Sequence, residues 1–240
     1  MKPAFFVGSL PFLNVPAAIE FVQKESAHLP FLPQLPELNP QEDMIGQVLR
    51  GFELGFWDEQ ASCALELFQN TFCESPGFKI QIAGPNTIAR TLSLPFENIA
   101  PQWVTLVQGL HQQLRQGSFT GELWIQIDEP YLPHKGTAYL LAELQPKLNR
   151  TVFGLHSCAT VRPEADPELW AALRFMAFDC SKTPVSEAEK RLWDQWLQED
   201  SRRVLAWGQP LNQPIEDAWA LAQPQVWRSA PCGLYGQRLY

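Results

Sequence analysis

The stretch Leu123-Trp124-Ile125-Gln126-Ile127 is a nearly continuous apolar run, and Asp128-Glu129-Pro130 follows it directly. A short apolar run with little polar alternation is typical of a parallel strand that is covered on both faces. Runs of this kind recur along the chain, and one of them contains Pro33, which is unfavourable inside a strand. The predicted strands span residues 4–8, 31–35, 79–83, 123–127, 151–155, 175–178, 204–207 and 225–228.

Helical patterns separate these predicted strands. In residues 98–116, apolar side chains recur at the spacing of one helix face, and Gly117 follows as a stop signal. Ser186 and Glu189 have the spacing of a capping box, which predicts a helix over residues 186–198. Further helices are predicted over residues 14–24, 40–53, 58–71, 137–145, 166–173 and 214–222.

The alternation of strands and helices predicts the α/β class, and the number of strands predicts a single (β/α)8 TIM barrel over residues 1–240. A barrel of this kind takes about 250 residues, close to the 240 of this chain. An open doubly wound sheet is the alternative. Such sheets often bind dinucleotides through a G-x-G-x-x-G turn, but Gly8-Ser9-Leu10-Pro11 lacks the second glycine.

The composition argues against several classes of protein. The chain has 18 basic and 26 acidic residues, so we expect neither a nucleic acid nor an anionic membrane surface as a partner. No apolar stretch approaches the roughly 18 residues of a membrane span, and Gly8, Pro11 and Pro16 interrupt the apolar N-terminal segment. Five cysteines without a tight framework are typical of reduced thiols, which predicts a cytoplasmic protein.

Polar and thiol residues follow several predicted strands at their carboxyl ends, where a barrel places its active site. His156 and Cys158 lie two residues apart, so both would point to the same side and could chelate one Zn²⁺. Cys232, together with Asp179 or Cys180, could complete the ligand set. The alternative is that these cysteines are small buried hydrophobic residues that bind no metal.

Asp128 and Glu129 leave the fourth predicted strand as a pair of carboxylates. Such a carboxylate can hold a substrate ammonium group or take part in proton transfer. It can also cap a helix or stabilise a turn. We favour the functional interpretation for Asp128 because it follows the strand directly. For Glu129 both interpretations remain open.

Taken in order, these motifs resemble the catalytic domain of cobalamin-independent methionine synthase, a barrel of the group that includes uroporphyrinogen decarboxylase. Ile125-Gln126-Ile127-Asp128-Glu129-Pro130 is similar to the family's fourth-strand motif, and Val7-Gly8-Ser9 is similar to its first-strand I-G-S. Ala83-Gly84-Pro85-Asn86-Thr87-Ile88 resembles its G-P-v-T-i turn. His156-Ser157-Cys158 resembles its zinc-binding H-x-C, and Pro231-Cys232-Gly233-Leu234 resembles its final D-C-G-L.

The resemblance implies a methyltransferase that uses Zn²⁺ to bind a small-molecule thiol substrate. In that family the acceptor is homocysteine and the product is methionine, so the resemblance implies a role in methionine biosynthesis. It implies that His156, Cys158 and Cys232 bind the metal. The family's remaining ligand is a Glu, and Asp179 stands near its place in this chain.

The resemblance also implies a binding site for the amino-acid part of the acceptor. Gly8 and Ser9 would meet the carboxylate of the acceptor, and Asp128 would meet its ammonium group. Glu129, next to Asp128, is a further candidate for substrate binding.

The chain departs from the family in the half of the site that binds the methyl donor. The Trp that stacks on the folate pterin has no counterpart, and no His follows His156 to act as the family's proton donor, so the catalytic residue is unknown. The donor is therefore open between methyltetrahydrofolate and a methyl-corrinoid, with a corrinoid carrier as a candidate partner. Two alternatives are a non-catalytic, ligand-binding relative and a metal-free lyase of the decarboxylase type on the same barrel, which would hold substrate carboxylates with arginines.

Overall fold

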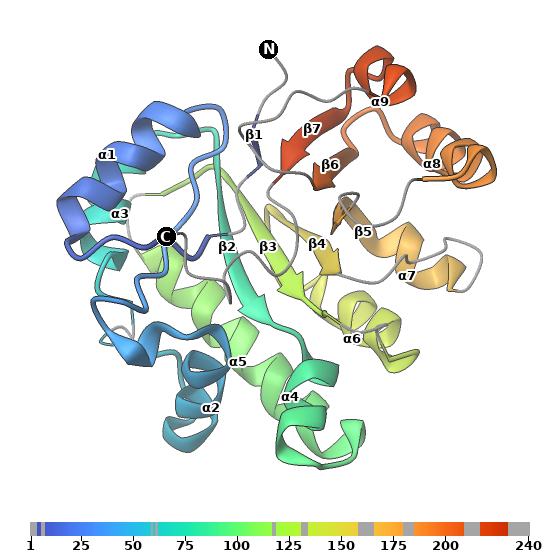
Figure 1. Cartoon of the computed structure of the whole chain (residues 1–240). Coiled ribbons are helices and arrows are strands. Elements are labelled where there is room, and N and C mark those ends of the chain that lie inside the picture. The colour runs from blue at the N-terminus through green and yellow to red at the C-terminus, as the bar shows by residue number, and fades with distance from the viewer. Residues whose placement is uncertain are drawn as a thin grey trace.

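The structure is a computed structural model that contains one sheet of parallel strands (Figure 1). It describes residues 4–5, 8–58, 60, 62–116, 119–130, 134–157, 166–179, 185–208 and 217–229. Within these residues, seven strands pair in the order β1-β7-β6-β5-β4-β3-β2. They are β1 (Ala4–Phe5), β2 (Gly77–Ala83), β3 (Glu122–Asp128), β4 (Thr151–Ser157), β5 (Leu173–Asp179), β6 (Val204–Gly208) and β7 (Val226–Ser229).

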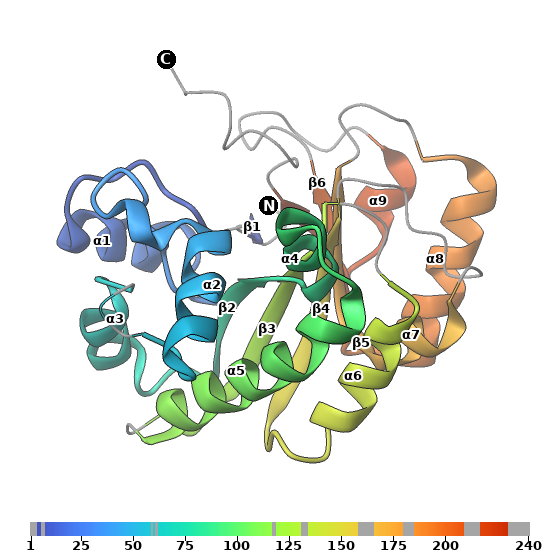
Figure 2. The same cartoon turned by 90° about the horizontal axis from the view of Figure 1, so that it is seen from below.

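Helices lie on the outer side of the sheet. Figure 1 shows α1 to α5 beside β2 and β3, and α6 to α9 beside β4 to β7, while Figure 2 shows the long helix α5 running beneath the strands. None of the helices in the described ranges is long and apolar enough to span a membrane. The helical elements are α1 (Val15–Glu25), the 3-10 helix η1 (Pro40–Glu42), α2 (Met44–Leu54), α3 (Leu65–Phe72), α4 (Pro85–Leu92), α5 (Phe96–Gln116), α6 (Gly136–Leu144), α7 (Pro167–Ala172), α8 (Glu187–Glu199) and α9 (Ala218–Ala222).

Local sequence explains where several helices begin. The Asn14 and Asp166 side chains cap α1 and α7 by accepting hydrogen bonds from a backbone N–H three residues later, at 2.9 and 3.0 Å. Ser186 and Glu189 form the predicted capping box at the start of α8. The alternation of parallel strands and helices confirms the predicted α/β class.

The chain around Pro33 links the two edges of the sheet, although it is not the continuous strand that was predicted. On one side, Leu32 N donates to the carbonyl of Lys79 in β2 at 2.8 Å. On the other, Gln34 N donates to the carbonyl of Gly8, just after β1, at 3.0 Å. In a regular strand these two N–H groups would point to the same side. Pro33 has no N–H group, and two isolated bridges on either side of it replace the continuous strand.

In β3, β4 and β6, apolar side chains alternate between two clusters on opposite faces of the sheet. The outer face packs against the helices through Ile80, Ile82, Ile125, Ile127, Phe153 and Leu155. The inner face carries a smaller cluster that includes Trp124, Val152, Phe175, Ala177, Val204 and Ala206. The Trp124 ring lies 5.3 Å from that of Phe175 and 6.2 Å from that of Trp227, so one aromatic group joins β3, β5 and β7.

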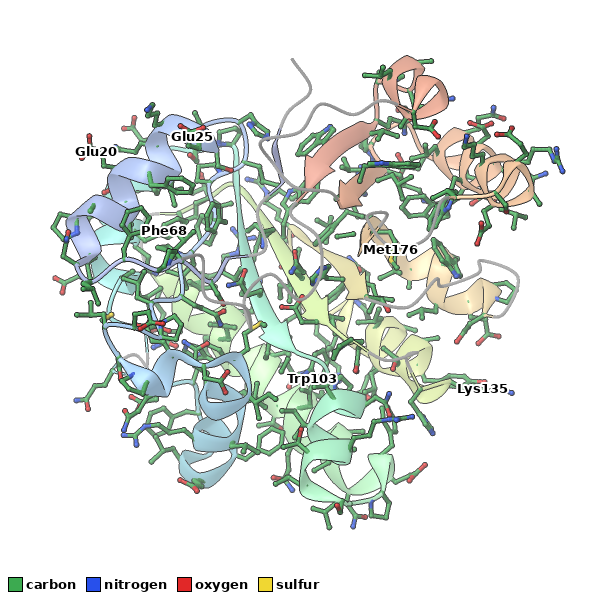
Figure 3. All side chains as sticks on the ribbon, in the orientation of Figure 1. Glu20, Glu25, Phe68, Trp103, Lys135 and Met176 are labelled. Atoms are coloured by element: carbon green, nitrogen blue, oxygen red, sulfur yellow. The ribbon has the colours of Figure 1, made fainter. Side chains whose placement is uncertain are left out.

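Trp103 of α5 fixes this helix against the end of β2. Its side chain is fully buried on the outer face of the sheet (Figure 3). The indole Nε1 donates a hydrogen bond to the carbonyl of Ala83, the last residue of β2, at 2.9 Å. The bond satisfies the polar end of a large buried ring and sets the height of α5 along the strand.

Replacement of Gly154 by alanine is expected to destabilise the inner face. An added Cβ would lie 2.1 Å from the Phe175 ring, so the ring must move out of a packed core. We expect Gly154→Ala to lower the free energy of unfolding by about 1–3 kcal/mol in urea titrations. Gly109→Ala in α5 is the matched control, because its Cβ would meet no atom within 4 Å. A gain of about 0.5–1 kcal/mol is expected there, and equal effects of the two variants would contradict the packing argument.

Candidate functional site

Asp128 and His156 form a buried pair at the carboxyl ends of β3 and β4. The two residues are register partners in the parallel sheet, so their side chains leave the strands side by side. Asp128 Oδ1 lies 3.1 Å from His156 Nδ1, and both side chains are more than nine-tenths buried. A carboxylate that faces one ring nitrogen selects the histidine tautomer in which this nitrogen carries the proton. The other ring nitrogen, Nε2, is then a lone-pair donor.

The second polar atom of each partner is buried and has no hydrogen-bond partner among the described residues. These atoms are Asp128 Oδ2 and His156 Nε2. A buried polar atom without a partner costs about 1–3 kcal/mol, so such atoms are typical of sites that bind a ligand, an ion or water. Together they provide a carboxylate acceptor and a nitrogen lone pair, side by side at the carboxyl ends of β3 and β4.

A chain of hydrogen-bonded side chains connects this pair to the middle of the inner face. Gln126 Nε2 donates to Asp128 Oδ1 at 2.6 Å, and Lys79 Nζ donates to Gln126 Oε1 at 3.2 Å. Lys79 is 1% exposed, and its ammonium group also lies 5.8 Å from the centre of the Phe31 ring. The Asp128–His156 pair is therefore connected through Gln126 to the buried amino group of Lys79.

A second arm of hydrogen-bonded side chains leads from Lys79 in the opposite direction, away from Asp128 and His156. Lys79 Nζ donates to Gln81 Oε1 at 3.1 Å, and Gln81 Nε2 donates to Gln34 Oε1 at 2.7 Å. Gln34 Nε2 then donates to Gln47 Oε1 at 2.6 Å, and Gln47 Nε2 donates to Ser62 Oγ at 3.3 Å. We call the two arms together the buried polar chain. Each amide nitrogen and oxygen of its glutamines has at least one hydrogen-bond partner, as a low-dielectric interior demands.

Gly8 and Ser9, predicted to bind substrate, lie against this second arm. Gly8 has a φ of 128°, and a Cβ there would lie 1.7 Å from Oε1 of Gln81, so both backbone and space require glycine. Ser9 Oγ donates to Gln34 Oε1 at 3.3 Å. Gly8, Ser9, Asp128 and the histidine are thus parts of one connected polar region. Binding of a substrate carboxylate by Gly8 and Ser9 stays a prediction.

Glu129 lies at the N-terminus of α4. One carboxylate oxygen accepts from Asn86 N at 2.8 Å, and the other accepts from Thr87 N and Thr87 Oγ1 at 2.9 and 2.6 Å. Burial raises the pKa of Glu129 to about 7, against the lowering effect of these hydrogen bonds. Gly84 makes room, because a Cβ there would lie 2.2 Å from Glu129 Oε1. These contacts correspond to the helix-capping interpretation, and substrate binding by Glu129 stays a prediction.

The predicted metal ligands fall only partly within the described residues. Cys158, Cys232 and Cys180 lie outside them, and of Asp179 the structure describes the backbone, which pairs with Gly208 at the end of β5. Among the described residues, no group of three or more His, Cys, Asp and Glu side chains could hold a metal ion. His156 is thus the one predicted ligand whose surroundings are known, and the four-residue site stays a prediction.

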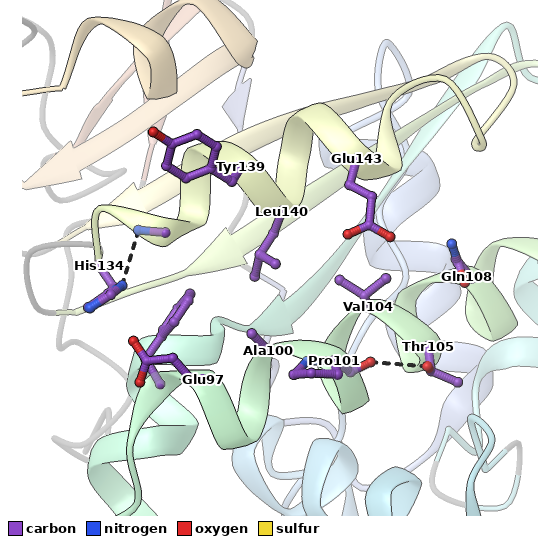
Figure 4. Close-up of a pocket in the computed structure, with 12 residues that line it drawn as sticks. Glu97, Ala100, Pro101, Val104, Thr105, Gln108, His134, Tyr139, Leu140 and Glu143 are labelled. Atoms are coloured by element: carbon purple, nitrogen blue, oxygen red, sulfur yellow. Dashed lines mark hydrogen bonds between the residues drawn. The ribbon is translucent and has the colours of Figure 1, made fainter.

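A separate groove of about 620 Å³ lies on the outer surface between α5 and α6 (Figure 4). Ala100, Val104 and Leu140 form an apolar floor, and Glu97 and Glu143 flank it. The Phe96 and His134 rings stack at one end, 4.1 Å apart. The groove is formed by helix side chains outside the sheet, so it does not contribute to the Asp128–His156 site.

The sequence prediction missed Lys79, Gln81 and Gln126 as parts of the site. Their signal was present, because Lys79 and Gln81 are two residues apart in a run that is otherwise apolar, as are Gln126 and Asp128. Polar residues at this spacing in a buried strand place a polar stripe on one face of the sheet.

The comparisons with known proteins identify no relative of this chain. No protein-family model matches it, and no curated protein and no solved structure does. The geometry of the inner face therefore carries the functional argument.

The cap on α4 can be tested by removing the Glu129 carboxylate. Glu129→Ala leaves two buried backbone N–H groups without their acceptor, while the Thr87 hydroxyl keeps the carbonyl of Asp128 at 3.3 Å, so we expect the free energy of unfolding to fall by about 1–3 kcal/mol. Glu143→Ala, which removes an exposed carboxylate of α6 that pairs with Lys147 just after the helix, is the control and should change stability by less than about 1 kcal/mol. Equal losses in urea titrations would contradict the capping role.

Lys79 should make the stability of the protein depend on pH. Burial lowers the pKa of Lys79 from 10.5 to about 7, and the negative charge of Asp128 opposes this shift. Between these values the unfolded chain binds more protons than the folded one, so stability rises with pH. We expect the free energy of unfolding to rise between pH 7 and 9, at a slope approaching about 1.4 kcal/mol per pH unit.

The control for this pH dependence is Lys79→Met, which removes the titrating group but keeps the length of the side chain. Urea titrations at several pH values give the difference between wild type and variant, in which other titrating groups cancel. The wild-type slope should exceed that of Lys79→Met. Identical slopes would show that Lys79 keeps an ordinary pKa.

Proposed function

We propose that this chain is a zinc-dependent enzyme that transfers a methyl group to a thiol, with homocysteine as acceptor and methionine as product. We further propose that its sheet closes through the segment around Pro33 into a single (β/α)8 barrel and that the protein works in the cytoplasm. The observation that carries the functional proposal is the Asp128–His156 pair, with one orphaned polar atom on each partner. The order of the motifs that resemble methionine synthase agrees with it.

The His156 side chain fits a metal ligand. Metal-binding histidines almost always donate their other ring N–H to a carboxylate or carbonyl, which fixes the ring and the tautomer. Asp128 Oδ1 supplies this acceptor at 3.1 Å from Nδ1, and the buried Nε2 is left for the ion. In the proposal, His156, Cys158 and Cys232 hold Zn²⁺, with Asp179 as a further ligand. Zinc bound at this place would lower the pKa of the acceptor thiol and so favour its reactive thiolate form.

Asp128 can bind the acceptor while it holds His156, because its two oxygens have different environments. Oδ1 accepts from Gln126 Nε2 and faces His156 Nδ1. Oδ2 is buried without a partner among the described residues and can accept from the ammonium group of an amino acid. Gly8 and Ser9, on the other arm of the polar chain, are proposed to meet the acceptor's carboxylate. The acceptor is thereby oriented with its thiol toward His156.

Metal analysis is the direct test of the zinc site. Protein purified without chelator should contain close to one zinc per chain, and His156→Asn, Cys158→Ser and Cys232→Ser should each lower this content. His134→Asn, which alters an exposed histidine beside α6, is the matched control and should keep the metal. A wild-type content below about 0.2 zinc per chain would contradict the proposal, because a catalytic site should approach full occupancy.

Product formation tests the reaction. Purified protein should form methionine from homocysteine with either methyltetrahydrofolate or methylcobalamin, and the active donor identifies the carrier. Asp128→Asn should raise the KM for homocysteine by about tenfold or more, because a carboxylate that faces an ammonium group becomes neutral. A zinc-loaded protein without turnover on either donor would favour a non-catalytic, ligand-binding relative. Binding of a porphyrinogen to metal-free protein would favour a lyase.

A further inference from the structure

Lys79 sets the direction of every hydrogen bond in the buried polar chain. The Lys79 nitrogen carries at least two hydrogens in either protonation state and donates to both of its amide neighbours, Gln81 Oε1 at 3.1 Å and Gln126 Oε1 at 3.2 Å. The oxygen of each amide therefore faces Lys79, and its NH₂ group faces away. The two arms run outward from one buried donor, each as donor to acceptor.

On the arm toward the candidate site, this direction determines what Asp128 can do. The Gln126 NH₂ group lies 2.6 Å from Asp128 Oδ1, so this oxygen acts as an acceptor. The same oxygen lies 3.1 Å from His156 Nδ1, and a carboxylate oxygen has no hydrogen to donate, so a ring N–H faces it. The hydrogen bond from Gln126 keeps the carboxylate turned so that Oδ1 lies against the ring. His156 then carries its proton on Nδ1, and the buried Nε2 holds a lone pair. Two side chains, Gln126 and Asp128, lie between Lys79 and His156.

We propose that Lys79 is a positioning residue that acts through Gln126 and Asp128 to hold His156 in the Nδ1–H tautomer, with Nε2 free to coordinate a metal ion. This inference rests on the proposed zinc site. It assigns a role to a residue that touches neither the metal nor the acceptor and that the methionine synthase motifs do not include. Lys79 is 1% exposed, and it reaches His156 through the hydrogen bonds of Gln126 and Asp128.

The tautomer can be measured without metal. Long-range ¹H–¹⁵N NMR spectra of the histidine side chains distinguish protonation at Nδ1 from protonation at Nε2, and His156→Asn identifies the signals of His156. We expect the Nδ1–H tautomer alone in wild-type protein. Lys79→Met and Gln126→Met remove successive links and should populate both tautomers. Gln47→Met is the matched control, because it removes a buried glutamine from the other arm and should leave the wild-type spectrum.

Zinc affinity gives a second readout by competition with a chelator. Loss of an outer partner of a metal-binding histidine typically weakens metal binding by about 10–100-fold, and this range is expected for Lys79→Met and Gln126→Met. The double variant should be no weaker than either single variant, because both break the same arm. Gln47→Met should keep the wild-type affinity.

The outcomes separate this inference from the proposed function. Protonation of wild-type His156 on Nε2 would overturn the inference, and so would wild-type tautomers in both Lys79→Met and Gln126→Met. If the tautomer follows Lys79 and the wild-type protein binds no zinc, the proposed function fails and the positioning role stands. Should Lys79→Met fail to fold, Gln126→Met, which changes only an amide into a thioether of similar size, carries the test.

Discussion

The inner face of the sheet depends on the hydrogen bonds of the buried Lys79 amino group, which must be compensated most strongly when the group is charged. An isolated charge in a low-dielectric interior is costly, and proteins retain one only where hydrogen bonds and an opposite charge compensate. Here two glutamine oxygens and, further away, Asp128 provide this compensation. The glutamine oxygens accept hydrogen bonds from Lys79, and the NH₂ groups of the same glutamines then require acceptors of their own. The polar chain is the consequence of one lysine in an otherwise apolar strand.

Asp128 connects the buried polar chain to the candidate site. Its Oδ1 is committed to Gln126 and His156, and its Oδ2 has no partner among the described residues. A carboxylate with both oxygens free would be mobile, and one with both oxygens satisfied could not bind a ligand. One oxygen of Asp128 thus holds His156, and the other can bind a ligand. This arrangement fits the preorganisation that binding sites require. Glu129, one residue later, contrasts with it, because both of its oxygens are used by α4.

Much of the fold could be predicted from the sequence, since apolar runs and helix signals are local. The runs that became β2 to β7 and the capping box of Ser186 and Glu189 are examples. The helix α4 was missed because Gly84-Pro85 has the composition of a turn, while its capping residue, Glu129, is distant in sequence. Of the site, Asp128 and His156 were predicted from their places at strand ends. Lys79 was not, because its importance arises only when β2 and β3 pair in register.

Gln34 connects the link between the two edges of the sheet to the hydrogen bonds of the candidate site. Its backbone links the segment around Pro33 to Gly8, and its side chain accepts from Gln81 and Ser9. The same residue therefore joins the sheet edges and receives the second arm of the polar chain. If this segment moved, Gln81 would lose its acceptor, and its amide would be free to turn its oxygen away from Lys79. The ammonium group would then depend on Gln126 alone, on the arm that leads to His156. Gln34 thus makes the hydrogen bonding of the candidate site depend on the link between the two edges of the sheet, which lies at the far end of the polar chain.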